Sequence, residues 1–210
     1  MKCPHCTINI YENWDTNSLH RFGNTLNWLY RSAQCPECKK LTIQFKRGDE
    51  EEWRQVFPFG SNRGPIPPDV PQSLAVDYEE ACLVLPLSAK ASAALSRRCV
   101  QNILRANGYK GRDLAVEIDL LLNEPDPRKA IPETLRTTID GIRNFGNFSA
   151  HPITDVTTLQ VIDVEPHEAE WCLEIIEEMF QQFYVRPAIA RARKAALDAK
   201  LASAGKPPSK

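Results

Sequence analysis

The motifs Cys3-Pro4-His5-Cys6 and Cys35-Pro36-Glu37-Cys38 decide how the N-terminal part of this chain can fold. In each C-x2-C motif two thiolates can reach one metal ion at about 2.3 Å, and four thiolates complete a tetrahedral shell around Zn²⁺. Residues 7–34 form a longer spacer than the usual ~15 to 20 residues, and a β-hairpin or a small insertion can absorb the difference. Because a four-cysteine shell leaves no position open for water, we predict one structural Zn²⁺ per chain. Its ligands are Cys3, Cys6, Cys35 and Cys38, and the alternative is a set of redox-active or unpaired thiols.

Composition and charge describe an ordinary soluble globular chain without a strong overall field. The chain has 210 residues, 42% of them hydrophobic and 25% charged, and a formal net charge of -1 with a pI near 6.4. Contact with nucleic acid or with a membrane therefore has to come from a local patch. No run approaches the ~20 apolar residues of a membrane span, and the first residues do not resemble a signal peptide. We expect no membrane association and a reducing, cytoplasmic environment, with which a thiolate zinc site agrees.

Residues 1–57 are predicted to form a small zinc-ribbon-like β domain. Apolar residues recur at every second position on both sides of the second cysteine motif, which is the pattern of strands. The residues that show this alternation are Leu26, Trp28 and Tyr30 before the motif and Leu41, Ile43 and Phe45 after it. The metal would replace the hydrophobic core that so short a segment cannot build alone. Trp14, Trp28 and Tyr30 could stack on bases, although aromatic side chains of such domains more often cover their own small core.

The rest of the chain is predicted to be helical. Residues 58–72 form a proline-rich connector, because proline removes backbone donors and disfavours helix just before it. Residues 73–203 show apolar positions at helical spacing, and 204–210 are expected to be a disordered tail. The predicted helices cover 76–85, 88–106, 113–122, a segment that begins at Pro132, another that begins at Pro166, and 187–202. Cys82, Cys99 and Cys172 lie in these apolar stretches and are interpreted as small buried hydrophobes. The predicted fold is therefore mainly α, with a helical bundle preceded by a small β zinc ribbon.

Four motifs, in a fixed order, carry a resemblance to a known family. They are Ile66-Pro67-Pro68-Asp69-Val70, Tyr78-Glu79-Glu80-Ala81, Ala94-Leu95-Ser96-Arg97-Arg98-Cys99 and Ile142-Arg143-Asn144-Phe145-Gly146-Asn147-Phe148-Ser149-Ala150-His151-Pro152. With these motifs the chain resembles the bacterial family called domain of unknown function 4145, which often carries N-terminal zinc knuckles. This family is grouped with the HEPN superfamily (higher eukaryotes and prokaryotes nucleotide-binding). The resemblance therefore implies a HEPN-like helical bundle and a homodimer, and many HEPN proteins are metal-independent ribonucleases of toxin and phage-defence systems.

The resemblance also implies a candidate catalytic group. In active HEPN ribonucleases an arginine and a histidine, separated by four to six residues, meet across the dimer. His151 would transfer protons and Arg143 would stabilise charge on the phosphate. Seven residues separate them here, so that Arg143 falls about 80° from His151 around a helix, whereas Asn147 falls about 40° away. The alternative interpretation is an Asn147–His151 hydrogen bond that fixes the end of a helix before Pro152.

Two further groups of cations are candidate nucleic-acid-binding residues. Arg97 and Arg98 could complete an anion-binding pocket, or they form an ordinary charged pair on the solvated surface of the predicted helix 88–106. The C-terminal helix is basic and could contact RNA or DNA phosphates, or it packs on a partner subunit. Its cations are Arg186, Arg191, Arg193, Lys194 and Lys200.

Together these features predict a zinc-binding, HEPN-like interaction module of a bacterial defence or stress system that binds nucleic acid or a protein partner. The alternative is a dimeric, metal-independent ribonuclease that uses His151, and a third hypothesis is a structural adaptor whose zinc unit mediates dimerisation. The altered spacing between Arg143 and His151 favours binding over cleavage. The sequence contains no phosphate loop, G-x-G-x-x-G, nucleophile elbow or H-E-x-x-H, which excludes the common nucleotide-binding, hydrolase and metalloprotease signatures.

Overall fold

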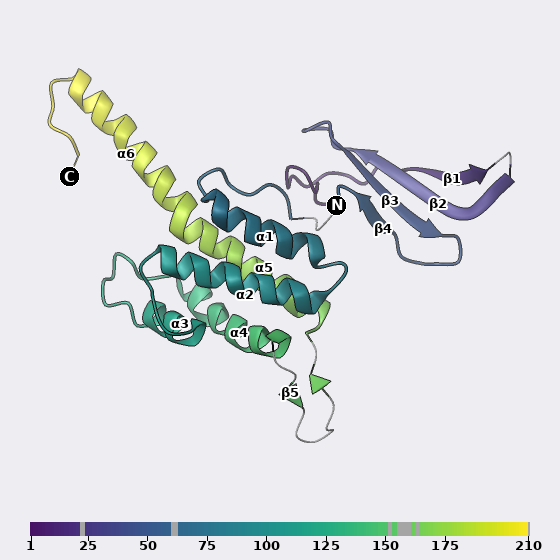
Figure 1. Ribbon diagram of the computed structural model, residues 1–210. Helices are drawn as coiled ribbons and strands as arrows, with labels where there is room; N and C mark the ends of the chain where they lie inside the picture. The colour runs from purple at the N-terminus through teal and green to yellow at the C-terminus, as the bar shows by residue number, and fades with distance from the viewer. Residues whose placement is uncertain (22–23, 60–62, 151–152, 155–160, 163, 210) are drawn as a thin grey trace. The chain divides into compact units, whose positions relative to one another are not determined.

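The chain is mainly helical with a small antiparallel sheet, as predicted, and it divides into two compact units (Figure 1). A computed structural model describes residues 1–21, 24–59, 63–150, 153–154, 161–162 and 164–209, without the side chains at 24–25, 143–150, 153–154 and 161–162. We call Met1–Pro65 together with Cys82–Leu87 the sheet unit, and Ile66–Ala81 together with Ser88–Lys210 the helical unit. Among the helices of the described residues, none combines the length and the apolar character needed to cross a bilayer.

The sheet unit is built on one four-stranded antiparallel sheet. Its strands are β1 (Asp15–Arg21), β2 (Asn24–Gln34), β3 (Leu41–Arg47) and β4 (Arg54–Phe57), and they lie side by side in chain order. The β1–β2 hairpin occupies most of the long spacer between the two cysteine motifs, which is how a hairpin was expected to absorb it. The predicted alternation on both sides of the second motif corresponds to β2 and β3, which pair from Trp28 opposite Arg47 to Gln34 opposite Leu41.

The register of the strands divides their side chains between two different faces. Residues directly opposite each other on antiparallel strands point to the same side, and such pairs include Tyr30 with Phe45 and Ile43 with Phe57. We call this side the aromatic face, and it comprises Leu26, Trp28, Tyr30, Leu41, Ile43, Phe45 and Phe57. On the opposite face the guanidinium carbon of Arg31 lies 4.3 Å from the centre of the Trp14 ring and 4.5 Å from that of Trp53.

The sheet unit has no hydrophobic core of the usual kind. Among the described residues of 1–65, the buried ones are Cys3, Pro4, Ala33, Cys35 and Thr42, and none of these has a large apolar side chain. A single sheet with one apolar face buries too little area to be stable by itself. Additional stabilisation therefore has to come from the cysteines or from a partner on the aromatic face.

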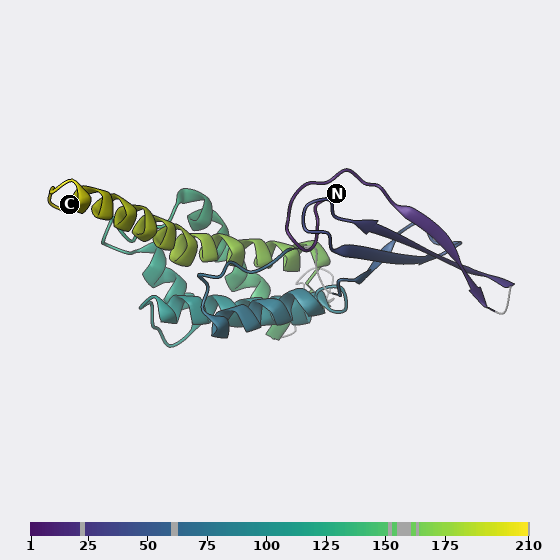
Figure 2. The ribbon, with the colours of Figure 1, turned by 90° about the horizontal axis from the view of Figure 1, so that it is seen from above.

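The helical unit, by contrast, is organised around a continuous apolar core. Its helices are α1 (Gln72–Val84, of which residues 82–84 belong to the sheet unit), α2 (Ala89–Ala106), α3 (Leu114–Leu122), α4 (Glu133–Ala150), α5 (Pro166–Phe180) and α6 (Arg186–Ser203). Helix α2 packs against α3, α4 and α5, and α4 also packs against α3 and α5 (Figure 2). The fully buried side chains between them include Ile103, Leu104, Ile118, Leu135, Ile139, Leu173, Ile176 and Phe180. Between α4 and α5, the short strands β5 (Ile153–Thr154) and β6 (Val161–Ile162) pair antiparallel.

Several helix ends carry capping residues, and α5 begins at Pro166 as predicted. The hydroxyl of Ser88 accepts a hydrogen bond from the backbone N–H of Ala91, and the Asp113 carboxylate accepts one from that of Val116, so both residues cap helices. Gly108 follows α2 with a positive φ of 95°, which glycine adopts without strain. Pro166 is the first residue of α5.

Two features of the helices differ from the prediction. On α2 the residues Cys99 and Ile103 are buried as expected, but Ala91 and Leu95 are only half-buried, and Ser92 and Ser96 take the inner positions. The buried face is rotated toward these small residues, and the Ser92 hydroxyl donates to the carbonyl of Ala81 in α1 at 2.8 Å. A five-residue π-helix, Gln181–Val185, joins α5 to α6, and the sequence pattern had given no sign of it.

Candidate metal centre

The two cysteine motifs fold into the same backbone loop. In the first, the N–H of Thr7 donates to the carbonyl of Cys3 at 2.9 Å, and in the second the N–H of Lys39 donates to that of Cys35 at 3.0 Å. Thr7 and Lys39 both adopt the left-handed conformation, with φ of 63° and 58°. Non-glycine residues seldom do so, and here the hydrogen bonds of the loop hold them. Two copies of one strained turn, facing each other, point to a shared role.

The four sulfur atoms converge on one point. The Sγ atoms of Cys3 and Cys38 lie 3.8 Å apart, those of Cys6 and Cys35 lie 3.7 Å apart, and all four ligand atoms fall within 4.8 Å of one another. A tetrahedron with metal–sulfur bonds of about 2.3 Å has edges of about 3.8 Å. A disulfide would instead need about 2.05 Å, and all four thiols are free. The arrangement therefore fits a tetrahedral ion such as Zn²⁺ and brings together the four predicted ligands.

Backbone N–H groups prepare these sulfurs for negative charge. The N–H of His5 donates to Cys3 Sγ at 3.4 Å. Backbone N–H groups of Cys38 and Glu37 lower the pKa of Cys35 to about 7. The pKa of Cys6 is nevertheless raised to about 12, because burial and the three neighbouring sulfurs outweigh the opposing effect of the Ile8 N–H. Four thiolates so close together therefore need a cation to balance them.

His5, which lies inside the first motif, connects this centre to the sheet. Its Nε2 lies 2.8 Å from the carbonyl oxygen of Leu41, the first residue of β3. Its ring also contacts Phe57 of β4, with ring centres 5.9 Å apart. His5 is therefore not a metal ligand. It connects the first cysteine motif to β3 and β4, two strands of the aromatic face.

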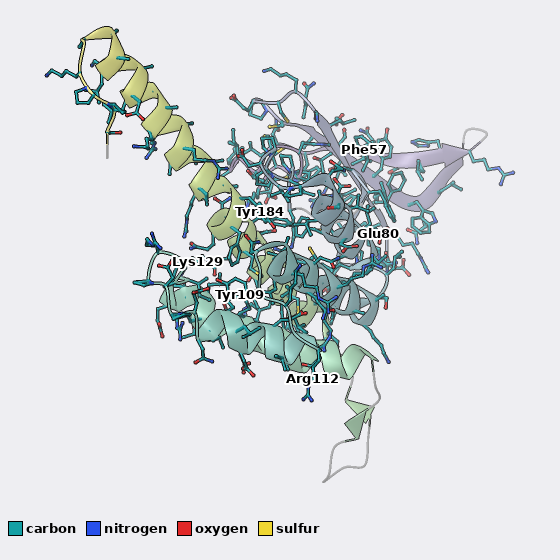
Figure 3. All side chains as sticks on the ribbon, turned by 60° about the vertical axis from the view of Figure 1, so that its left-hand side comes forward. Phe57, Glu80, Tyr109, Arg112, Lys129 and Tyr184 are labelled. Carbon is teal, nitrogen blue, oxygen red and sulfur yellow. The ribbon has the colours of Figure 1, made fainter. Side chains whose placement is uncertain are left out.

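The aromatic face is open to solvent over much of its area. Trp28 is 43% exposed, Leu41 40% and Phe57 49% (Phe57 is labelled in Figure 3), while Tyr30 stacks on Phe45 at 5.9 Å. Large side chains exposed together on one surface are typical of an interaction site. Of the three aromatic residues predicted as base-stacking candidates, Trp28 and Tyr30 belong to this face, whereas Trp14 covers Arg31 on the other side.

Charges around the aromatic face are balanced. By register, Arg47 and Arg54 lie on this face, opposite Trp28 and Phe45. Arg47 pairs with Asp49 at 2.8 Å and Arg54 pairs with Glu50 at 3.1 Å. Both carboxylates belong to the acidic run 49–52, which therefore neutralises the cations of this surface. A surface of this kind suits an apolar partner better than a phosphate backbone.

The predicted nucleic-acid-binding arginines of α2 have different surroundings. The guanidinium of Arg98 donates to Asp77 twice, at 2.9 and 2.6 Å, and to Glu80 at 3.0 Å, while Asn102 donates to the other oxygen of Asp77. Arg98 thus ties α2 to α1, and its charge is balanced by two carboxylates. Arg97 is half-buried, and burial lowers its pKa against the opposing effect of Asp113. The structure therefore gives Arg98 a structural function, and a nucleic-acid contact at either arginine stays a prediction.

The predicted catalytic residues cannot be placed. Positions 143 and 147 belong to α4, but the side chains of Arg143 and Asn147 lie outside the described part of the chain. His151 lies outside the described residues altogether. The hypothesis of a ribonuclease centre at these three residues therefore stays a prediction.

Sequence reasoning missed the residues that join the metal centre to its surroundings. The contact of His5 with Phe57 and the position of Trp53 over Arg31 were not predicted. The only available signal was the aromatic character of Trp53, just before the short strand β4, and of Phe57, the last residue of that strand. Their partners depend on strand register, which the residue pattern alone does not determine.

Comparison with known proteins gives one match. The model of the family described as domain of unknown function (DUF4145) matches residues 79–202, which is more than half of the chain. No curated protein and no solved structure matches. The matched segment lies almost entirely in the helical unit, so the four cysteines are an addition to the part that the family model covers.

Proposed function

This chain belongs to the DUF4145 family, and from this premise we propose that it is a zinc-stabilised interaction module whose sheet unit docks on a protein partner. The observation that carries the proposal is the set of sulfur–sulfur distances, 3.7 and 3.8 Å, beside an open aromatic face. The ion would be structural, because four cysteines fill its coordination shell and leave no position for substrate or water.

Zinc and the docking surface are two parts of one arrangement. Zinc would fix the first cysteine motif against the second, and His5 would transmit that position to Leu41 and Phe57 of the aromatic face. Zinc would also supply the stability that a unit without large buried side chains lacks, since structural zinc sites contribute about 10 to 16 kcal/mol of apparent binding free energy. The aromatic face should therefore keep its shape only while the metal is bound.

A protein is a better partner for this face than nucleic acid. The exposed groups are an indole, a phenyl ring and aliphatic side chains, and the two arginines nearby are neutralised by Asp49 and Glu50. Aromatic residues with few charges are typical of the buried centre of protein interfaces. Because the resemblance to HEPN proteins implies a homodimer, a second copy of the chain is the first partner to test. The same resemblance is the basis for two further parts of the proposal. The helical unit would be a HEPN-like bundle, and the protein would act in a bacterial defence or stress system.

The test is an assembly measurement on purified, zinc-loaded protein. Sedimentation equilibrium should show a dimer that dissociates in a Trp28→Ser/Phe57→Ser variant, and a Tyr11→Ser variant is the matched control. Tyr11 is 92% exposed and lies outside the strands, so its loss should leave assembly unchanged. If the protein is a monomer, a photo-crosslinking residue at position 28 should capture another protein in cells, and capture should be lost with Phe57→Ser. A monomer whose crosslinks at 28 and 11 are the same would rule the docking surface out.

The ribonuclease hypothesis has its own test on the same material. Purified protein is incubated with mixed RNA beside a His151→Ala variant, after removal of free metal. Cleavage that is lost in the variant would replace the binding module with an enzyme. Absence of any His151-dependent cleavage is the result expected here, because seven residues instead of four to six separate Arg143 from His151.

A further inference from the structure

Helix α6 stands apart from the core of its own unit. Figures 1 and 2 show that it continues from α5 beyond the ends of α2, α3 and α4, and none of its residues is buried. Helices usually owe their stability to a packed face. Here alanine, the best helix former, occupies much of the sequence, and α5 supplies the first turns, so no separate nucleation is needed. The helix therefore forms without a fully buried residue, and most of its surface is available to a partner, apart from the side to which the tail 204–209 returns.

This helix concentrates positive charge in a chain that is slightly acidic overall. Five basic side chains on α6 oppose a single carboxylate, Asp198, whereas the whole chain has a net charge of -1. That carboxylate pairs with Lys194 at 3.8 Å and also accepts from the backbone N–H and the hydroxyl of Ser209, both at 2.7 Å. The tail 204–209, which the sequence predicts to be disordered, thus brings Ser209 back to α6, where it also accepts from the Lys194 ammonium.

Three of the cations form a straight row. Arg186, Arg193 and Lys200 follow one another at intervals of seven residues. On an α-helix, seven residues complete almost two full turns, so these side chains share one face at intervals of about 10 Å. In the described part of the chain no carboxylate pairs with any of the three. A row of this kind offers regularly spaced charges to an extended anionic partner.

We propose that α6 binds the phosphate backbone of nucleic acid without reading its sequence. Charge decides against a second copy of the helix as occupant, because two such helices would repel each other. A protein interface needs large apolar anchors at its centre, but the exposed large apolar residues of α6 are Ile189 and Leu197 only. Phosphate contacts need charge and close approach, and the alanines between the cations permit that approach.

The proposal predicts a steep dependence of affinity on salt. Each phosphate neutralised on duplex DNA contributes about 0.9 to the slope of log affinity against log salt. If all five cations make contacts, affinity should fall about 500-fold between about 50 and about 200 mM salt. Removing the row of three should lower the slope of log affinity against log salt by about 2.7. Affinity should then fall only about tenfold over the same range of salt. The effect is independent of the sheet unit, so zinc chelation should leave it unchanged even if the proposed docking function fails.

The experiment is a fluorescence-anisotropy titration of the full chain with a labelled DNA duplex of about 20 base pairs and with a single-stranded RNA of similar length. The variant is Arg186→Gln/Arg193→Gln/Lys200→Gln, which keeps the helix because glutamine has nearly the same helix propensity. The matched control, Lys90→Gln/Lys110→Gln/Arg112→Gln, removes the same charge from exposed positions of the helical unit outside α6. Figure 3 shows Arg112 on the side of this unit away from α6.

Binding that weakens in the α6 variant, with the smaller salt slope, and persists in the control supports the proposal. Equal weakening in both variants would mean that only the net charge matters and would overturn it. A polyglutamate chain of similar length that competes as well as the duplex would assign α6 to an acidic protein instead. No binding of either nucleic acid at low salt would also overturn the proposal. Far-UV circular dichroism checks that the variant has kept its helix.

Discussion

The two units of this protein are stable for different reasons. The helical unit buries a set of large aliphatic side chains and Phe180 between its helices, whereas the described residues of 1–65 bury only Cys3, Pro4, Ala33, Cys35 and Thr42. In the first case stability grows with the apolar area removed from water. In the second, we propose that a metal ion held by the four sulfurs replaces the core. A unit stabilised in this way would not need to bury its aromatic residues, which would account for the open aromatic face.

The difference extends to how each unit treats its charges. In the helical unit, Arg105 donates to the fully buried carboxylate of Glu117 at 2.6 Å, and Arg98 is bound by two carboxylates. In the sheet unit the corresponding arginine, Arg31, lies against two indole rings and donates to Gln44 instead. Charges in the helical unit thus join helices, while in the sheet unit Arg31 is covered by indole rings on one face and the arginines of the aromatic face pair with the acidic run 49–52.

The largest expected effect is that loss of the metal unfolds the sheet unit and leaves the helical unit folded. Cys38→Ser, or treatment with a strong zinc chelator, should unfold the sheet unit, because it removes most of the ~10 to 16 kcal/mol that a structural zinc site supplies. Three of the four tryptophans, Trp14, Trp28 and Trp53, report on that unit by fluorescence, whereas far-UV circular dichroism reports on the helices. Metal analysis should give one zinc per chain in the wild type. The helical signal should remain.

A cysteine substitution in the helical unit is the control for this result. Cys172 is buried in α5 and does not belong to the sulfur cluster. Cys172→Ala should therefore lower the melting temperature of the helices, whereas the zinc content should stay at one per chain. If chelation changes neither the tryptophan fluorescence nor the metal content, the sheet unit is held by something other than zinc.

The next largest effect concerns the buried ion pair of the helical unit. Arg105→Met leaves the Glu117 carboxylate buried, and within the described part of the chain its remaining donor is the backbone N–H of Gly111, at 3.3 Å. Removing one partner of a buried pair costs about 3 to 5 kcal/mol, and because Arg105 is itself partly exposed we expect about 3 kcal/mol. Urea unfolding followed by circular dichroism measures the loss, and zinc content should not change.

A double substitution shows whether this loss comes from the orphaned charge. Arg105→Met/Glu117→Leu replaces the pair by apolar groups of similar volume, and such replacements are often neutral or stabilising. The double variant should therefore be more stable than Arg105→Met alone. If it is less stable, the packing around Glu117 and not the charge explains the single variant.

The sequence was informative where a local pattern determines structure. C-x2-C spacing predicted which sulfurs meet, because each motif folds as a turn independent of the rest of the chain. Alternation predicted β2 and β3, and Ser88 and Pro166 marked the starts of helices. Each of these features depends on residues within a few positions of one another, and such short-range rules carry over from sequence to structure.

It was uninformative where structure depends on contacts between distant segments. The buried face of α2 is turned toward Ser92 and Ser96, whereas Ala91 and Leu95 are only half-buried. The Ser92 hydroxyl donates to the carbonyl of Ala81 in α1, a contact between helices that periodicity does not specify. Trp53 contacts Arg31 because of the register in which β4 pairs with β3, and the alternation of apolar residues does not determine that register. The π-helix at 181–185 likewise has no residue signature in the pattern that predicted a helix there.

A smaller effect is the difference in stability cost between two glycine-to-alanine substitutions, one in each unit. A β-carbon at Gly141 of α4 would lie 2.6 Å from the Trp171 ring, whereas one at Gly48 would meet only the end of the Asn27 side chain. Gly141→Ala should cost up to about 2 kcal/mol, since overpacking costs about 1 to 3 and the gain in helix propensity returns about 1. Gly48→Ala should change stability little, because the Asn27 amide can turn away. Thermal unfolding of both variants measures the contrast, and equal costs would mean that the Trp171 ring moves as easily as the Asn27 amide.

The smallest effect is a pH dependence confined to the helical unit. The pKa of Asp113 lies below its ordinary value of 3.8, because its carboxylate accepts from the Val116 N–H and lies beside Arg112. A lowered pKa in the folded state means that the charged form stabilises folding above the ordinary pKa, and that this contribution is lost as acid protonates the group. Asp113→Asn keeps a capping side chain but cannot titrate, so the difference in stability between wild type and variant should be complete above the ordinary pKa of 3.8 and shrink as the pH falls through the lowered pKa of the folded state. Urea unfolding followed by circular dichroism, from about pH 7 to about pH 2, measures that difference. A difference that stays constant across this range would show that the hydrogen bond of Asp113, and not its charge, stabilises the first turn of α3. The acid sensitivity of the helical unit would then come from its other carboxylates.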